Sequence, residues 1–107
     1  MEAIKLPVYR GEVSGGSPLI SVREQAKKMG VNHNTIARAY SELEREGFIE
    51  TRRGMSSVIT HNAQLIEKQR QQHIASITNN FVREIKQLKV DAPELERLLD
   101  DIKSTFK

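Results

Sequence analysis

The chain has 107 residues, 37% of them hydrophobic, with a formal net charge of +3 and a pI near 9.4. This length allows one domain, or a small domain with a helical appendix. The absence of cysteine excludes disulfides, thiolate metal sites and cysteine nucleophiles. No run approaches the roughly 18 apolar residues of a membrane span, and no signal-peptide pattern begins the chain. We therefore expect a cytoplasmic protein, and its three scattered histidines predict no metal site.

The first residues predict a short helix followed by a loop. Met1 to Arg10 carries Ile4 and Val8 at helical spacing, although Pro7 between them counts against a helix because proline is costly in a helix interior. Gly11 to Pro18 is rich in glycine and serine, and we expect it to be a connecting loop.

A helix is predicted to begin after Ser21 and to end at Gly30. Ser21 and Glu24 form a capping box, in which the hydroxyl and the carboxylate each bind an unpaired backbone N–H at the helix start. Glycine favours the left-handed conformation that ends helices. Apolar residues recur at helical spacing and predict one narrow buried face, made of Val22, Ala26 and Met29.

A second helix is predicted over His33–Glu46, capped by Asn32. The two residues between Gly30 and this helix force a steep crossing, as in a helix–turn–helix. Its predicted buried stripe is Ile36, Tyr40 and Leu43. The opposite face carries Asn34, Arg38 and Ser41, flanked by Thr35 and Glu42. Short polar side chains at the start of a helix allow close entry into a major groove, which is the design of a recognition helix.

A basic hairpin is predicted to follow Gly47. Phe48 to Arg52 and Ser57 to Thr60 predict two short strands, and Gly54 supplies the positive φ of a tight turn. A hairpin after a helix–turn–helix is a wing. Arginines at its tip suit phosphates or a minor groove.

Two amphipathic helices are predicted after the hairpin. The first runs from about Asn62 to Leu88, Val90 to Pro93 breaks it, and the second follows. Two exposed apolar faces need a partner surface, so we expect self-association. The expected dimerisation residues are Ile74, Ile77, Phe81, Ile85, Leu88, Leu95, Leu98, Leu99 and Ile102.

Residues Gly11 to Ala26 and Val31 to Gly54 resemble, without gaps, the winged-helix domain of GntR-type bacterial transcription regulators. The short two-helix tail resembles that of the YtrA subfamily. The resemblance implies a homodimeric regulator, usually a repressor, that binds a palindromic operator in double-stranded DNA. Three features depart from the family pattern: a shortened first helix, Ile20 where proline is usual, and a wing tip without its second glycine.

The resemblance also implies which residues contact DNA. The position of the family's DNA-contacting arginine at the start of the first motif helix is occupied by Arg23. The expected contacts of the recognition helix are Asn32, His33, Asn34, Thr35 and Arg38, and those of the wing are Arg52, Arg53 and Gly54.

Simpler roles remain open for some of these residues. Arg38 could pair with Glu42 at i+4, but its position opposite the buried stripe favours DNA. Arg23 lies in a helix's first turn, where the macrodipole disfavours a cation, and this mismatch favours a functional role. The wing arginines could be plain strand-edge charges. His33 is open between a contact with DNA and a solvated position.

These patterns predict a mainly α protein: a winged helix–turn–helix in residues 1–60 with a small β-hairpin wing, then a two-helix dimerisation tail in residues 61–107. No phosphate-binding glycine loop or buried carboxylate pair is predicted, so we expect neither an enzyme nor a bound cofactor. The alternative function is a winged-helix interaction module with weak or lost DNA binding. The sequence does not indicate an effector.

Overall fold

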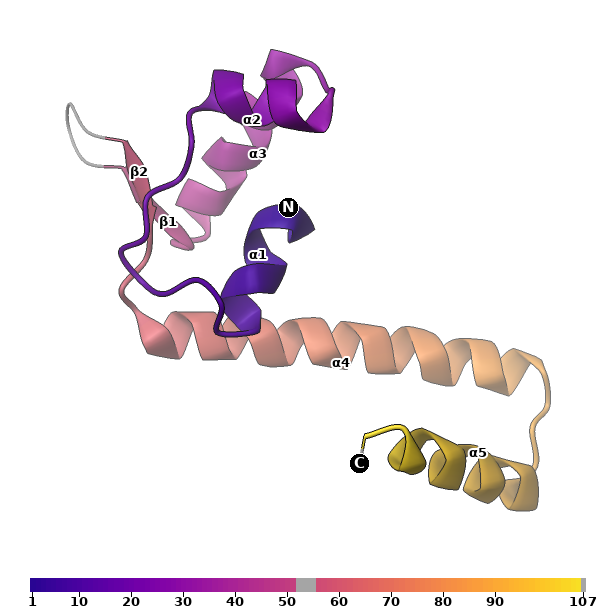
Figure 1. Cartoon of the computed structure of the whole chain (residues 1–107). Helices are drawn as coiled ribbons and strands as arrows, with labels where there is room; N and C mark the ends of the chain where they lie inside the picture. Colours follow the sequence, from indigo (N-terminus) through magenta and orange to yellow (C-terminus); the bar gives the residue numbers. More distant parts are fainter. Residues whose placement is uncertain (52–55, 107) are drawn as a thin grey trace. The chain divides into compact units, whose positions relative to one another are not determined.

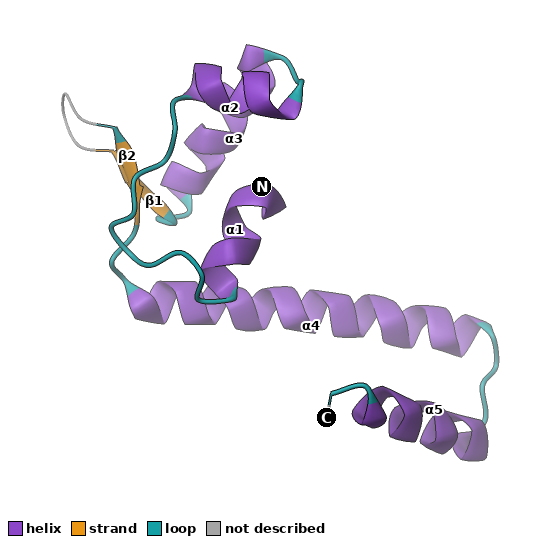
Figure 2. Ribbon diagram, in the orientation of Figure 1, coloured by secondary structure: helices purple, strands orange, loops and turns teal. Residues whose placement is uncertain are grey.

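A computed structural model describes residues 1–51 and 56–106 of the chain. Within them the elements follow one another as α1 (Glu2–Tyr9), α2 (Val22–Met29), α3 (His33–Arg45), β1 (Ile49–Thr51), β2 (Ser57–Ile59), α4 (Ala63–Gln87) and α5 (Ala92–Ser104) (Figures 1 and 2). The mainly helical class with one small hairpin is therefore confirmed. The backbone divides into a first unit of residues 1–71 and a second unit of residues 72–107, each described separately below. The domain boundary expected after residue 60 stays a prediction.

Helix α1 forms although Pro7 lies in its interior. The N–H that proline lacks would have bonded to the carbonyl of Ala3, and Ala3 is exposed to solvent. The Pro7 carbonyl accepts hydrogen bonds from the Glu12 and Val13 backbone N–H groups at 2.9 and 3.3 Å. The helix is therefore short and joined directly to the loop that follows it.

The ends of α2 are as predicted, with one difference in the cap. The Ser21 Oγ accepts from the Glu24 backbone N–H at 3.1 Å, and Gly30 has φ +66°. The Glu24 carboxylate accepts from the Ser21 hydroxyl, where the capping box predicts acceptance from the Ser21 backbone N–H. Met29 was expected in the core but is 43% exposed, at the last position of the helix. The buried polar residue of α2 is Gln25, which the apolar pattern did not predict.

The Gly/Ser-rich segment before α2 is more ordered than the predicted loop. The Ile59 N–H donates to the Ser17 carbonyl at 2.8 Å, and the Leu19 N–H donates to the Ser57 carbonyl at 2.9 Å. An isolated bridge pairs Pro18 with Val58. The segment therefore lies along the free edge of β2, while β1 pairs antiparallel on the other edge with Glu50 opposite Val58.

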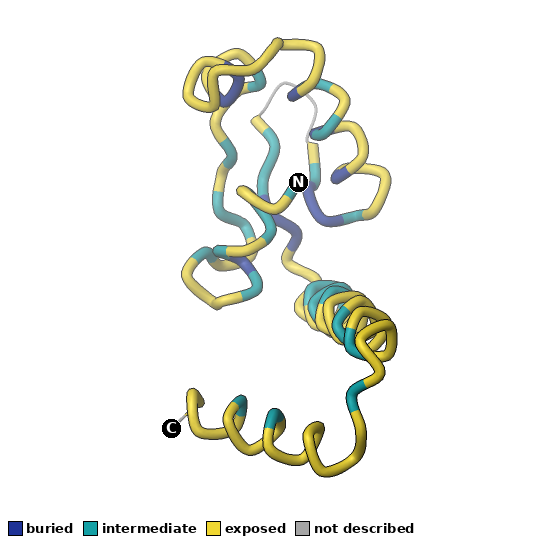
Figure 3. The backbone as a smooth tube through the Cα atoms, turned by 90° about the vertical axis from the view of Figure 1, so that its right-hand side faces the viewer, coloured by how far each residue is buried: buried dark blue, intermediate teal, exposed yellow. Residues whose placement is uncertain are grey.

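The core lies in the first unit, between α1, the two motif helices and the hairpin. Phe48, Ile36, Leu43 and Ile49 are its largest fully buried side chains. The predicted stripe of α3 is confirmed, since Ile36, Tyr40 and Leu43 are all buried. In Figure 3 the buried positions among the described residues all fall in this unit.

The second unit contains the rest of α4 and α5. The 62–88 helix is confirmed as Ala63–Gln87, and α5 begins after Asp91, whose side chain accepts from the Glu94 N–H at 2.9 Å. Neither helix contains a buried residue among those described. The apolar faces of both helices are therefore open in a single protomer.

Candidate nucleic-acid interface

The start of α3 gathers the expected recognition residues on the side away from the core. Asn32, His33, Asn34, Thr35 and Arg38 are all exposed, while Ile36 and Tyr40 face inward. Asn32 also caps the helix, because its Oδ1 accepts from the Asn34 backbone N–H at 2.7 Å. The N-terminus of α3 is therefore exposed, and there the helix dipole favours an anion.

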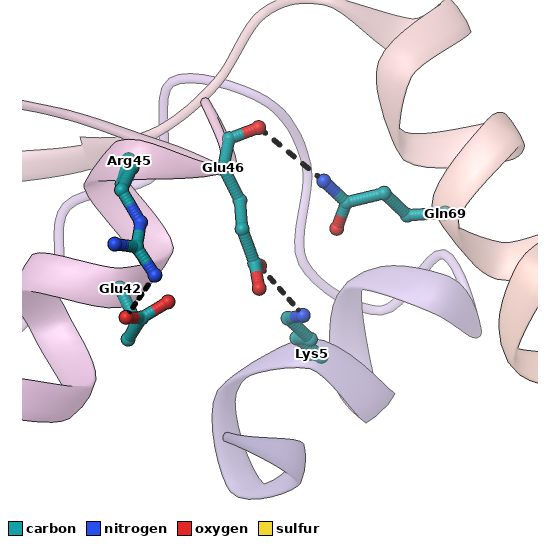
Figure 4. Close-up of polar contacts among 5 residues, drawn as sticks. All are labelled: Lys5, Glu42, Arg45, Glu46 and Gln69. Atoms are coloured by element: carbon teal, nitrogen blue, oxygen red, sulfur yellow. Dashed lines mark hydrogen bonds and ion pairs between the residues drawn. The ribbon is translucent and has the colours of Figure 1, made fainter.

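Arg38 does not make the intrahelical pair that the sequence left open. Glu42 pairs with Arg45 at i+3, at the far end of α3 (Figure 4). Arg38 makes no ion pair with any residue that the structure describes. Its guanidinium is therefore available to a ligand outside the protein.

Helix α2, which precedes the turn of the motif, carries exposed cations at both of its ends. Arg23 is exposed in the first turn, where no described carboxylate pairs with it. Lys27 and Lys28 are exposed in the last turn, where the helix dipole favours cations. A cation in the first turn is unfavourable for the stability of the helix, so the position of Arg23 favours a functional role.

Of the wing, the structure describes the two strands at its base, β1 and β2. Thr51 Oγ1 and Ser57 Oγ lie 2.9 Å apart across the strands. The expected wing contacts Arg52, Arg53 and Gly54 lie outside the described residues.

A hydrogen bond anchors α3 to the segment before α2. The Tyr40 hydroxyl donates to the Ile20 backbone carbonyl at 2.9 Å. Burial raises the pKa of Tyr40, and the negative charge of Glu24 raises it further. The sequence predicted Tyr40 as core but gave no signal of this bond, because its acceptor is a backbone atom 20 residues away.

At the other end of α3, residues of α1 and α4 both bind Glu46. The Glu46 carboxylate accepts an ion-paired hydrogen bond from Lys5 Nζ of α1 at 2.8 Å, and the Glu46 carbonyl accepts from Gln69 Nε2 of α4 at 3.4 Å (Figure 4). The Lys5 Nζ also lies 5.6 Å from the centroid of the buried Phe48 ring. Neither Lys5 nor Gln69 was singled out from the sequence. We call Lys5, Glu46 and Gln69 the α3 anchor.

Other kinds of site have no support in the described part of the chain. No group of three or more His, Cys, Asp or Glu side chains there is placed to hold a metal ion. None of the helices described is long and apolar enough to cross a membrane.

Two packed helices joined by a short turn, the second with an outward polar start, and a hairpin after them define a winged helix–turn–helix DNA-binding domain. A family model described as bacterial regulatory proteins, gntR family, matches residues 1–59. The chain belongs to this family.

Relatives match the tail as well. The chain is 38% identical over 97 residues to the HTH-type transcriptional regulator YhcF of Bacillus subtilis, across 91% of this chain and 78% of that protein. It is 39% identical over 109 residues to the HTH-type transcriptional repressor YtrA of the same organism, across 96% and 78%. A solved GntR family transcriptional regulator from Listeria monocytogenes superposes with a TM-score of 0.84 at 32% identity, covering 94% of this chain and 88% of that one. The protein is thus a DNA-binding transcription regulator and not an enzyme, and its resemblance to YtrA-type regulators is confirmed.

Proposed function

We propose that the protein is a homodimeric repressor that binds a palindromic operator and blocks RNA polymerase by occupying the promoter. The similarity to YtrA, whose name describes a repressor, supports the direction of regulation. Half-sites of a palindrome match the two-fold symmetry of a dimer. We also expect the protein in the cytoplasm, on the nucleoid when it is bound.

The observation that carries the dimer is the open apolar surface of the second unit. Ile77 is 57% exposed and Leu88 is 73% exposed, and none of the nine expected dimerisation residues is buried. Among the described residues, no Cα atom of α4 lies within 8 Å of a Cα atom of α5, so the two helices do not pack closely against each other. A second copy of the chain offers the same apolar surface and would bury both.

The DNA contacts are proposed from the exposed face of the motif. Asn34, Thr35 and Arg38 contact base edges in the major groove, with Asn32 and His33 beside them at the helix start. Arg23 binds a backbone phosphate. The wing contacts at Arg52, Arg53 and Gly54 remain part of the proposal on sequence grounds alone.

Sedimentation equilibrium tests the dimer. The wild-type chain should be dimeric at micromolar concentration, whereas Ile77→Glu should weaken the dimer at least about tenfold, since it places a charge on the proposed contact face. Asn79→Glu is the matched control on the same helix and should leave the dimer unchanged. A monomeric wild-type chain would contradict the proposal.

Genome-wide footprinting in the source bacterium would identify the operator, and a purified fragment then tests the contacts. At about 0.15 M salt the protein should prefer the palindrome to random DNA. Arg38→Ala should cost roughly 1–3 kcal/mol and relax specificity. Arg45→Ala, which removes an arginine already paired with Glu42, is the control. Equal affinity for operator and random DNA, together with a tight oligomer, would instead support the interaction-module alternative.

A further inference from the structure

A hollow lies beneath the motif, on the side of α1. It has a volume of about 250 Å³, and its walls are mainly apolar side chains from α1 and residues 13–20, such as Ile4, Pro7 and Leu19. Its size is close to the lower end of ligand pockets, which typically span about 300–1,000 Å³. If each non-hydrogen atom with its hydrogens takes the volume of a water molecule, about 30 Å³, the hollow holds roughly eight non-hydrogen atoms. The space therefore suits a small organic molecule.

One polar side chain in this wall makes no hydrogen bond to the rest of the described protein. Gln25 is only 9% exposed and lines the hollow. Its side-chain amide makes no hydrogen bond to any residue that the structure describes. The amide atoms themselves are reached by solvent, so water in the hollow can bond to them in the free protein. A ligand that displaces this water can take over the same hydrogen bonds.

The charge beside the hollow is positive. Lys28 lines it and makes no ion pair with a described carboxylate. The adjacent surface carries Lys27 and Lys28 with the carboxylate of Glu24, which lies one turn earlier on α2. Two ammonium groups against one carboxylate leave the charge beside the apolar wall positive on balance. This combination fits an anion on a small apolar body.

We propose that this hollow binds a small monocarboxylate with an apolar body, of about eight non-hydrogen atoms in all. The carboxylate meets the Lys28 ammonium and the Gln25 amide N–H, and the body packs against Ile4 and Leu19. Of these two contacts, the one with the Lys28 ammonium is the stronger, because both of its partners are charged.

The hollow also touches the helix that reads DNA. Gln25 and Lys28 belong to α2, and Tyr40, which also lines the hollow, belongs to α3. A bound monocarboxylate offsets the charge of Lys28 and so lowers the net positive charge of a domain that binds a polyanion, which lowers its affinity for DNA. On the proposed repressor function, on which this step rests, such a ligand is an inducer.

Three probes of nearly equal size test the site in the full-length chain: benzoate, benzamide and benzylamine. Two-dimensional ¹H–¹⁵N spectra should show saturable benzoate shifts at Gln25, Lys28 and Leu19, with a Kd below about 10 mM. Benzamide should bind several-fold more weakly, and benzylamine should not saturate. No saturation by benzoate, or equal binding of benzylamine, would overturn the site.

Variants separate a ligand role from a structural one. Lys28→Gln should weaken benzoate binding at least about fivefold, whereas Lys27→Gln, its neighbour on α2, should not. Gln25→Leu keeps the volume and removes the unpaired amide, so its Tm should not fall while benzoate binding weakens. Ala3→Phe fills the hollow from an exposed position on α1 and should abolish the shifts. Benzoate affinity that is unchanged in Lys28→Gln, Gln25→Leu and Ala3→Phe, as it is in the Lys27→Gln control, would refute the assignment.

The DNA step has its own measurement. Saturating benzoate should lower affinity for the footprinted operator by at least about threefold, and operator should weaken benzoate by the same factor. Saturable benzoate binding without this coupling would overturn the inducer role. A chain that binds no operator even without benzoate contradicts the proposed function, while the spectra still decide whether the site exists.

Discussion

Replacing Lys5 with methionine tests how strongly α1 holds the end of the recognition helix. The variant removes the ion pair to Glu46 and the cation near the Phe48 ring. Methionine keeps an unbranched apolar stem, so the packing of the lysine stem is largely preserved. The change in the free energy of unfolding therefore reports mainly on charge.

The expected loss is about 1 kcal/mol. The Lys5 side chain is 19% exposed, but its partner Glu46 is 39% exposed, so solvent screens the pair. A solvent-accessible pair contributes about 0.2–1 kcal/mol, and a cation over an aromatic ring adds about 0.5–1 kcal/mol. The more favourable burial of methionine offsets part of this sum. In a domain of about 60–100 residues, each kcal/mol lowers Tm by roughly 4–8 °C.

A double-mutant cycle with Glu46→Gln isolates the pair. Urea unfolding at one fixed protomer concentration should give a coupling energy of about 0.5–1 kcal/mol. The control is the Arg10–Glu12 pair, with an N···O distance of 3.2 Å and side chains 59% and 58% exposed. Its coupling should be below about 0.3 kcal/mol, since both partners are well solvated. Equal coupling in the two cycles would refute the claim that Lys5 anchors α3.

Three further substitutions test the fold. Tyr40→Phe removes the hydrogen bond to Ile20 and should lower the free energy of unfolding by about 1 kcal/mol. Burial, and then the charge of Glu24, raise the Tyr40 pKa, so the stability of the wild-type protein should fall as pH rises above about 10. Denaturant midpoints measured against pH should fall less steeply in the variant. Phe48→Ala empties a fully buried position and should cost about 3–5 kcal/mol by urea unfolding; a loss below about 1 kcal/mol would contradict its place in the core. Gly30→Ala places a Cβ at φ +66° and should lower stability by about 1 kcal/mol, whereas an unchanged Tm would contradict the strained position.

Local patterns predicted the parts of the fold that local physics decides. The Ile36, Tyr40 and Leu43 stripe follows from helical spacing, and the caps at Asn32 and Gly30 follow from side-chain and backbone chemistry within a few residues. The extended pairing of residues 16–19 with β2 was missed, because glycine and serine carry no alternating apolar pattern.

The candidate site was predictable only where residues act through their own helix. The exposed face of α3 could be derived from spacing, with the exposure of Arg38 as the clearest case. The partners of Lys5 and Tyr40 could not, since their bonds join residues 41 and 20 positions apart and depend on the assembled core. The environment of Gln25 likewise depends on distant parts of the chain, since Gln25 lines the hollow together with residues of α1 and the 13–20 segment.

The two contacts of Glu46 differ in what substitution can do to them. Its carboxylate, which binds Lys5, is lost with almost any replacement at this position, whereas its carbonyl, which accepts from Gln69, belongs to the backbone and is present whatever the side chain. A single base change in the codon can therefore remove the ion pair to α1, but not the hydrogen bond from α4. Among descendants of this chain, position 46 should drift together with position 5, while the tie to α4 can be lost only through changes elsewhere.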